Sequence, residues 1–301
     1  MQKNKKQETL KFFRAYSKVL NFSPEIKKDG LALIQLLQKH DPLDITRFEF
    51  SFKIKQEKIL PILRFLNIDA HGYSCRSPFL FINRLNSFKE IITGTGSRLP
   101  AKIYRALKEI SANPMDLYFG ADIFSDKYFF AFWVIFGGVD KHGRANFWPY
   151  DFKKILANFW RVTGFYPPKI IKEKILNLGI DISSRGMTYK LYYLYEKNSF
   201  PIFQALVKEI DKKLKGHKYF YFVSEMYNPK GHFLKTKLFI EFLEDLDKIK
   251  KIKFLLNKLN GVQGINLNIP NLTKVFSRTK SRLVLISFEK DNTLTFYMRP
   301  K

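Results

Sequence analysis

The sequence predicts an α+β protein in which about ten antiparallel strands form a closed barrel surrounded by helices. Three observations lead to this prediction. Segments of alternating hydrophobicity occur in pairs joined by short turns, amphipathic helical segments separate the pairs, and one strand face combines lysine with aromatic residues. No linker-like stretch divides the chain, so we expect residues 1–301 to form one domain with a helical N-terminal segment at 1–40.

Helical periodicity recurs along the whole chain. Amphipathic patterns predict helices at 8–20, 24–40, 100–112, 149–162, 168–178, 200–215 and 245–259. In the helix at 245–259, for example, Leu246, Ile249 and Ile252 fall on one stripe, followed by Leu256 and Leu259. Each helix has one apolar face to bury, and a strand face is the available partner.

Strand periodicity occupies the segments between these helices. Residues 45–55 alternate strictly, and 68–82 is interpreted as a second strand. Hairpins are predicted at 116–136 with a turn at 125–126, at 179–196 with a turn at 185–186, at 218–242, and at 282–299. Strands joined by such tight turns run antiparallel.

The two faces of these strands differ in composition. The face predicted to pack on helices is apolar, as in Phe48, Phe50, Phe52 and Ile54. The opposite face carries Arg47, Glu49, Ser51, Lys53, Lys190, Tyr192, Leu194, Phe233, Lys235, Lys237, Phe239, Glu241, Thr293, Thr295, Tyr297 and Arg299. An open sheet would expose this face to water, whereas a closed barrel would turn it inward around a ligand chamber. We favour the barrel, which also removes the sheet edges.

Two lysines at i and i+2 on one strand face repel each other. For Lys235 and Lys237 this repulsion costs stability unless an anion or water offsets it. The formal net charge of +26 also suggests a polyanionic partner, such as nucleic acid, an acidic membrane surface or a phosphorylated small molecule. A coding bias toward AT-rich codons explains the lysine excess equally well.

Other classes of protein lack support in the sequence. Cys75 is the single cysteine, and the five histidines lack metal-ligand spacing, so neither a disulfide framework nor a protein metal site is expected. The longest apolar run, at 128–139, is too short to span a bilayer. We expect a cytoplasmic, monomeric protein without a membrane partner.

Short strand motifs resemble those of the ABBA-type aromatic prenyltransferases, whose ten antiparallel strands form a barrel inside a ring of helices. Lys190-Leu191-Tyr192 is similar to the K-x-Y motif of that family, and residues 235–239 (KTKLF) resemble its basic-x-Lys-x-Tyr motif with phenylalanine in the last position. Residues 295–297 (TFY) resemble a later polar-x-Tyr strand, and residues 49–51 (EFS) resemble the E-x-S of the first barrel strand.

The resemblance implies transfer of a prenyl group from an allylic diphosphate, dimethylallyl or geranyl, to an aromatic acceptor. It implies a diphosphate site formed by Arg47, Lys53, Lys190, Lys235, Lys237 and Arg299. It further implies aromatic groups that shield the allyl cation and line the acceptor site, namely Tyr192, Phe239, Tyr297 and Trp133. Glu49 is the implied catalytic residue, which takes or orients a proton. No organic cofactor is implied, and any Mg²⁺ would be held through the diphosphate.

Three alternatives remain open from the sequence. The acceptor is either a small molecule or a peptide side chain, since the length is similar to bacterial small-molecule members and to cyanobactin-type peptide prenyltransferases. A nucleic-acid-binding protein would instead use an open lysine-aromatic sheet as a stacking platform, although we do not favour a nucleic-acid partner. A non-catalytic barrel that only binds ligand is suggested by Phe239 in place of tyrosine.

Overall fold

A computed structural model describes residues 2–40, 47–55, 57–68, 78–112, 116–124, 127–139, 145–147, 152–165, 175–183, 186–196 and 200–301. The helices are α1 (Gln2–Val19), α2 (Pro24–His40), α3 (Pro78–Gly94), α4 (Ala101–Ile110), α5 (Phe152–Thr163), α6 (Gln204–Lys213), α7 (Ile249–Leu259) and α8 (Ile269–Thr279). The long strands are β1 (Arg47–Lys55), β2 (Lys58–Ile68), β3 (Asp116–Phe124), β4 (Lys127–Ile135), β7 (Ile175–Ser183), β8 (Gly186–Leu194), β9 (Tyr219–Tyr227), β10 (Phe233–Leu246), β11 (Ser281–Glu289) and β12 (Leu294–Pro300). Two short strands, β5 (Gly137–Val139) and β6 (Ala145–Phe147), pair separately.

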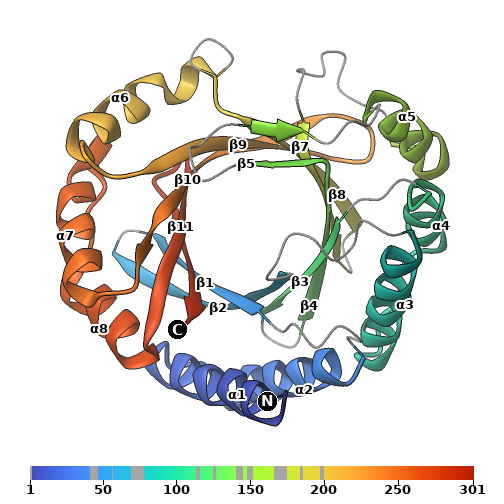
Figure 1. The fold of residues 1–301 in the computed structure, drawn as a ribbon, viewed down its shortest axis with the longest axis horizontal. Coiled ribbons are helices and arrows are strands. Elements are labelled where there is room, and N and C mark those ends of the chain that lie inside the picture. The colour runs from blue at the N-terminus through green and yellow to red at the C-terminus, as the bar shows by residue number, and fades with distance from the viewer. Residues whose placement is uncertain are drawn as a thin grey trace.

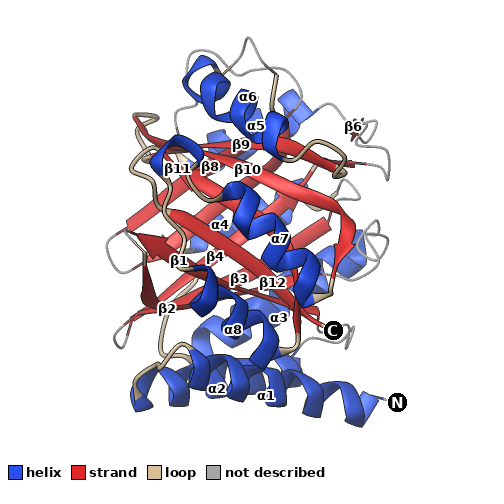
Figure 2. Cartoon of the chain, turned by 90° about the vertical axis from the view of Figure 1, so that its left-hand side faces the viewer, coloured by secondary structure: helices blue, strands red, loops and turns tan. Residues whose placement is uncertain are grey.

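The ten long strands pair in one antiparallel series, β1-β12-β11-β10-β9-β8-β7-β4-β3-β2. The series returns to its start, because β1 pairs both with β12, where Phe50 lies opposite Met298, and with β2, where Phe50 lies opposite Phe65. The strands therefore form a closed barrel. Figure 1 shows the strands around a central space and the helices α1 to α8 in a ring outside them. Figure 2 shows α1 and α2 side by side near one end of the molecule.

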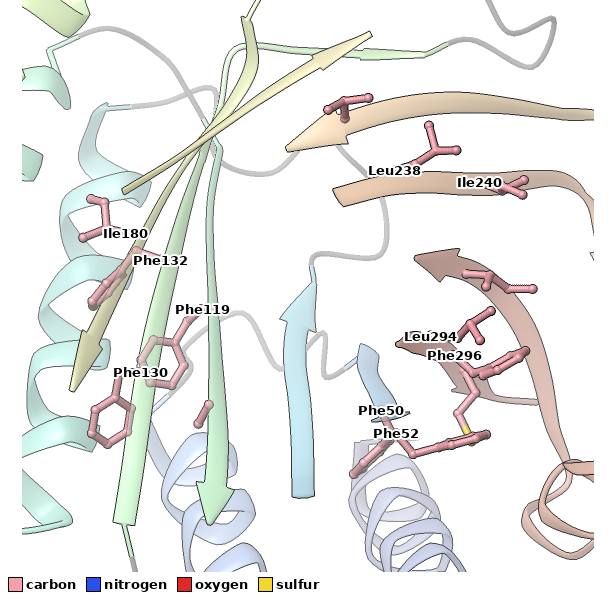
Figure 3. Close-up of a cluster of buried hydrophobic side chains, with 14 of the residues drawn as sticks. Phe50, Phe52, Phe119, Phe130, Phe132, Ile180, Leu238, Ile240, Leu294 and Phe296 are labelled. Carbon is pink, nitrogen blue, oxygen red and sulfur yellow. The ribbon is translucent and has the colours of Figure 1, made fainter. Parts of the chain in front are cut away.

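The apolar core lies between the outer face of the strands and the helices. Phe50 on β1 is fully buried, with its ring 4.8 Å from Phe12 and 5.2 Å from Tyr16 on α1. Tyr16 also donates a hydrogen bond to the carbonyl of Ser51 at 2.6 Å, which ties α1 to the same strand. Figure 3 shows Phe50 pointing toward the N-terminal helices, Phe52 beside Phe296, on which it stacks with ring centroids 5.5 Å apart, and Phe119, Phe130 and Phe132 on β3 and β4. This packing leaves the inner face to the remaining side chains.

Most of the predicted elements are confirmed. The antiparallel pairing of ten strands, the helices on their outer face and the four hairpins agree with the structure, although residues 125–126 and 185, at two predicted turns, lie outside the described part. The helices predicted at 8–20, 24–40, 100–112, 149–162, 200–215 and 245–259 correspond to α1, α2, α4, α5, α6 and α7. Residues 269–279 form a helix, α8, that the sequence analysis did not predict.

Two predicted elements are wrong. The strand predicted at 68–82 conflicts with α3, which begins at Pro78, and the second strand of the barrel is instead β2 at 58–68; residues 69–77 lie outside the described part. The α3 segment buries Phe81, Leu85, Phe88 and Ile92, a helical spacing that the dense aromatic run concealed. The helix predicted at 168–178 conflicts with β7, which begins at Ile175; residues 166–174 lie outside the described part. Within that part, no helix is long and apolar enough to cross a membrane.

Candidate active site inside the barrel

The inner face of the barrel encloses a cavity of about 120 Å³. Seven of the residues predicted for the site line this cavity: Glu49, Trp133, Lys190, Tyr192, Lys237, Phe239 and Tyr297. The expectation that lysines and tyrosines from strands distant in sequence share one central cavity is therefore confirmed. The lysine-aromatic face is an enclosed lumen.

Strand alternation explains how these side chains reach the lumen. On β8, Lys190 and Tyr192 point inward. The neighbouring Tyr189 points outward, where its ring stacks on that of Phe165 with the centroids 4.1 Å apart. On β10, Lys237 and Phe239 point inward, and the intervening Leu238 is fully buried in the outer core. Each inward residue is thus fixed by an outward neighbour packed under a helix.

Three lysines converge on one carboxylate at Glu289, the last residue of β11. Glu289 lies 2.6 Å from the Nζ of Lys237, 3.2 Å from that of Lys235 and 3.9 Å from that of Lys53. We call Lys53, Lys235 and Lys237 the lysine triad. Burial alone would raise the pKa of Glu289, but the lysines, led by Lys237, lower it to about 2. Glu289 is the anion that offsets the repulsion expected between Lys235 and Lys237.

The lysines of the triad experience a different balance. Burial, together with the charge of Arg64, lowers the pKa of Lys53 to about 8 in spite of Glu289. Burial and the neighbouring Lys53 and Arg64 lower the pKa of Lys237 well below its usual value. Positive charge therefore exceeds negative charge around the triad, and one carboxylate does not fully compensate it.

Two further cation-carboxylate pairs lie in the lumen, and each is one to one. Arg64 on β2 donates from two guanidinium nitrogens to the two carboxylate oxygens of Asp122 on β3. Although burial opposes it, the Arg64 charge lowers the pKa of Asp122. Lys190 lies 2.5 Å from Asp181 across the β7–β8 hairpin, and this carboxylate raises the pKa of Lys190 against the effect of burial.

An aromatic group lies beside these charges. Trp133 donates a hydrogen bond from Nε1 to the hydroxyl of Tyr192 at 3.0 Å, and the Tyr192 ring lies 5.9 Å from Phe239. Phe239 stacks on Phe222 with ring centroids 4.5 Å apart and 6° between the planes, and lies 6.4 Å from Tyr297. These rings form an apolar section of the lumen, joined by Leu176 and Leu285.

Glycine at position 179 makes this arrangement possible. A Cβ atom there would lie 3.1 Å from the Cβ of Lys190, 3.1 Å from the Tyr192 ring and 3.4 Å from Nε1 of Trp133. Lys190 and the Tyr192 ring would have to shift by a few tenths of an ångström to admit it, whereas the distance to Trp133 is an ordinary contact. The absence of a Cβ at Gly179 therefore leaves room for Lys190 and Tyr192 where they lie.

Glu49 is almost completely buried, at 4% exposure, and its partner is Arg299 on the neighbouring strand. Arg299 donates from Nε to Glu49 at 3.1 Å. Burial raises the pKa of Glu49 even though Arg299 opposes the shift. Burial also raises the pKa of Glu241, on β10, to about 7, with Arg299 lowering and Glu49 further raising it. A carboxylate with raised proton affinity is suited to accept a proton.

The remaining predicted residues are placed as follows. Lys53, Lys235 and Arg299 are not among the residues that line the cavity; the two lysines pair with Glu289, and Arg299 pairs with Glu49. Arg47 lies on β1, but its side chain is outside the described part. Sequence reasoning missed Arg64, Asp122, Asp181 and Glu289. The last three lie on predicted strands, and an acidic residue on an otherwise apolar or cationic strand face was the available signal.

The ten-stranded antiparallel barrel with an outer ring of helices is the fold of the ABBA-type aromatic prenyltransferases. PriB, in a binary complex with product diphosphate, matches with a TM-score of 0.66 at 10% identity, over 98% of this chain and 95% of that chain. A 6-dimethylallyl tryptophan synthase matches with a TM-score of 0.64 at 10% identity, over 95% and 93%. NotF in complex with brevianamide F and DMSPP matches with a TM-score of 0.59 at 10% identity, over 97% and 93%. Neither a protein-family profile nor a curated protein sequence matches the chain.

Proposed function

We propose that the protein transfers a prenyl group from an allylic diphosphate to an aromatic acceptor. The observation that carries this proposal is the convergence of lysines, an arginine and aromatic rings on one enclosed cavity inside a prenyltransferase barrel. Two solved structures of the same fold are complexes, that of PriB with product diphosphate and that of NotF with brevianamide F and DMSPP. We further propose that the whole chain acts as one domain, as a cytoplasmic monomer.

The lumen cations stabilise the leaving group. When the bond between the allylic carbon and the diphosphate oxygen breaks, negative charge grows on the diphosphate. Lys190, Lys237 and Arg64 line the cavity, and Lys53 and Lys235 lie beside Lys237 around Glu289. Because Lys190 and Lys237 are only 13% and 9% exposed, their effect on the developing charge is stronger than in solution.

The aromatic rings stabilise the other fragment. An allyl cation attracts the negative face of an aromatic ring, with a contribution of about 0.5–2 kcal/mol per contact. Tyr192, Phe239, Tyr297 and Trp133 present such rings next to the cations. Phe239 retains the ring face that a tyrosine would offer, so its lack of a hydroxyl does not remove this interaction.

Glu49 completes the reaction in this proposal. After the acceptor ring attacks the allyl carbon, the ring must lose a proton to regain aromaticity. Glu49 lines the cavity, is held by Arg299, and has a raised pKa because of burial. It is therefore positioned to orient the acceptor or to receive this proton.

The size of the cavity bears on the substrates. Its volume of about 120 Å³ is below the roughly 300–1,000 Å³ typical of ligand pockets, so substrate entry requires lumen side chains to move. This favours the dimethylallyl over the geranyl donor. Among the described residues, no group of three His, Cys, Asp or Glu side chains could hold a metal, and Asp122 and Asp181 are paired with cations. Mg²⁺, if used, would be held through the diphosphate.

The acceptor class is an aromatic small molecule or an aromatic peptide side chain. Nucleic acid is not favoured, because Lys190 and Lys237 are 13% and 9% exposed and face the lumen instead of an outer surface. A stacking platform for single strands needs an open face.

The test is a prenyl-transfer assay with purified protein, dimethylallyl and geranyl diphosphate, and a panel of indoles, tyrosine derivatives and aromatic peptides, with and without EDTA. We expect transfer from the dimethylallyl donor, and loss of transfer in Lys190→Met. Absence of turnover with every acceptor, combined with diphosphate binding, would favour the non-catalytic barrel. Salt-resistant binding of single-stranded DNA would favour the nucleic-acid class.

A further inference from the structure

Positive charge is unevenly matched among the ion pairs of the lumen. Arg64 forms an ion pair with Asp122, and Lys190 forms one with Asp181, so each of these two cations is matched by one carboxylate. At Glu289 one carboxylate lies between three ammonium groups. Charge balance therefore identifies the lysine triad as the part of the lumen with the greatest unmatched positive charge.

The Glu289 carboxylate lies between the three lysines, at the position that a bound anion would take. Its two oxygens are shared, since Oε1 faces Lys237 at 2.6 Å and Lys53 at 3.9 Å, while Oε2 faces Lys235 at 3.2 Å. The Glu289 side chain is 13% exposed and that of Lys237 is 9% exposed, so little water competes for this contact, whereas Lys235 is 41% exposed. Lys237 also lines the cavity, so an anion bound there competes with the Glu289 carboxylate for the charge of this ammonium.

We propose that Glu289 is a displaceable counter-ion: its carboxylate neutralises the lysine triad in the empty barrel, and a diphosphate displaces it on binding. This inference rests on the proposed function for the identity of the anion. A diphosphate carries more negative charge and more acceptor oxygens than one carboxylate, so it satisfies three ammonium groups more completely. Glu289 in turn lowers the affinity for diphosphate and returns to the lysines when the product leaves.

The electrostatics of the triad agree with this role. Burial and neighbouring cations lower the pKa of Lys237 and of Lys53 even with Glu289 present, so the ammonium forms gain from a more highly charged partner. The Asp122 carboxylate differs, because both of its oxygens accept from one guanidinium in a bidentate pair that leaves no excess charge.

The test is calorimetric titration of inorganic diphosphate into the full-length protein and into Glu289→Gln. We expect Glu289→Gln to bind diphosphate at least 10-fold more tightly, because the competing carboxylate is gone while all three lysines remain. The matched control is Asp291→Asn, which removes a carboxylate two residues away that is 52% exposed and paired with Lys55. Its affinity should equal that of the parent.

Several results separate this inference from the proposed function. Equal or weaker binding by Glu289→Gln, or no binding by either protein, would overturn the counter-ion role, whatever the prenyl-transfer assay gives. If the parent transfers prenyl groups, Glu289→Gln should also show product inhibition by diphosphate at concentrations at least 10-fold lower. Should Glu289→Gln fail to fold, as judged by melting, Glu289→Asp serves instead. Its shorter carboxylate retreats from Lys237, and we expect binding a few-fold tighter than in the parent.

Discussion

Replacing Lys237 by methionine removes one charge from the lumen while keeping most of the side-chain volume. The Nζ of Lys237 lies 2.6 Å from Glu289 and the side chain is 9% exposed. A unit charge about 4 Å from a departing phosphate oxygen contributes about 4 kcal/mol at an effective dielectric constant of about 20. Part of that interaction already exists before the bond breaks, so we expect kcat to fall by about 10²- to 10³-fold, which corresponds to about 2.7–4 kcal/mol.

The assay is steady-state prenyl transfer beside thermal melting. We expect only a small change in Tm, because Glu289 keeps Lys235 at 3.2 Å and Lys53 at 3.9 Å after Lys237 is lost. Lys55→Met is the matched control, since Lys55 is an exposed lysine that also pairs with a carboxylate, at 2.8 Å from Asp291. Turnover by Lys237→Met equal to that of an active parent would refute the assignment of the lysine triad to the leaving group.

Three other changes test the rest of the lumen. Tyr192→Phe keeps the ring and loses only the hydroxyl that accepts from Trp133, so we expect kcat to fall less than about 10-fold in the same assay, and a larger loss would mean that the hydroxyl itself takes part. Glu241→Gln should raise the free energy of unfolding by about 1–3 kcal/mol at pH 8 and leave it unchanged at pH 4, as measured by urea unfolding. The reason is that burial raises the folded-state pKa of Glu241 to about 7, so ionisation of this carboxyl costs stability as pH rises from about 4.5 through 7. An equal increase in the free energy of unfolding at both pH values would contradict this. Phe222→Ala removes the ring stacked on Phe239 and enlarges the lumen, so the use of geranyl relative to dimethylallyl diphosphate should rise by about 10-fold or more, and an unchanged ratio of kcat/KM values would show that this ring does not limit the donor.

Alternation made the faces of several strands predictable from the sequence. Phe50 and Phe52 pack under helices, while Glu49 and Ser51, which alternate with them along the strand, line the cavity, as the period of two requires. The same rule assigned Lys237 and Tyr297 to the lumen. What alternation cannot give is which side chains from different strands meet, because that depends on strand register and closure.

The missed part of the site follows from this limit. Arg64 lies on β2, in an apolar run with hydrophobic residues at both parities and with Pro61, so no strand was predicted there. Its partner Asp122 and the partner of Lys190, Asp181, were visible on predicted hairpins, but only pairing across strands shows that they neutralise lumen cations. A count of lysines on one face therefore overstated the positive charge of the lumen.

The pairing of β1 with β12 has a consequence for how the chain folds. It joins residues such as Phe50 and Met298, about 250 positions apart, whereas the other neighbouring strands in the barrel lie closer in sequence. Contacts between distant residues form slowly, because the loop that connects them must be closed before they contribute stability. During synthesis β1 emerges first and waits, with an unpaired edge, for the last strand made. Until β12 is made, this edge of β1 is open to pairing with another chain.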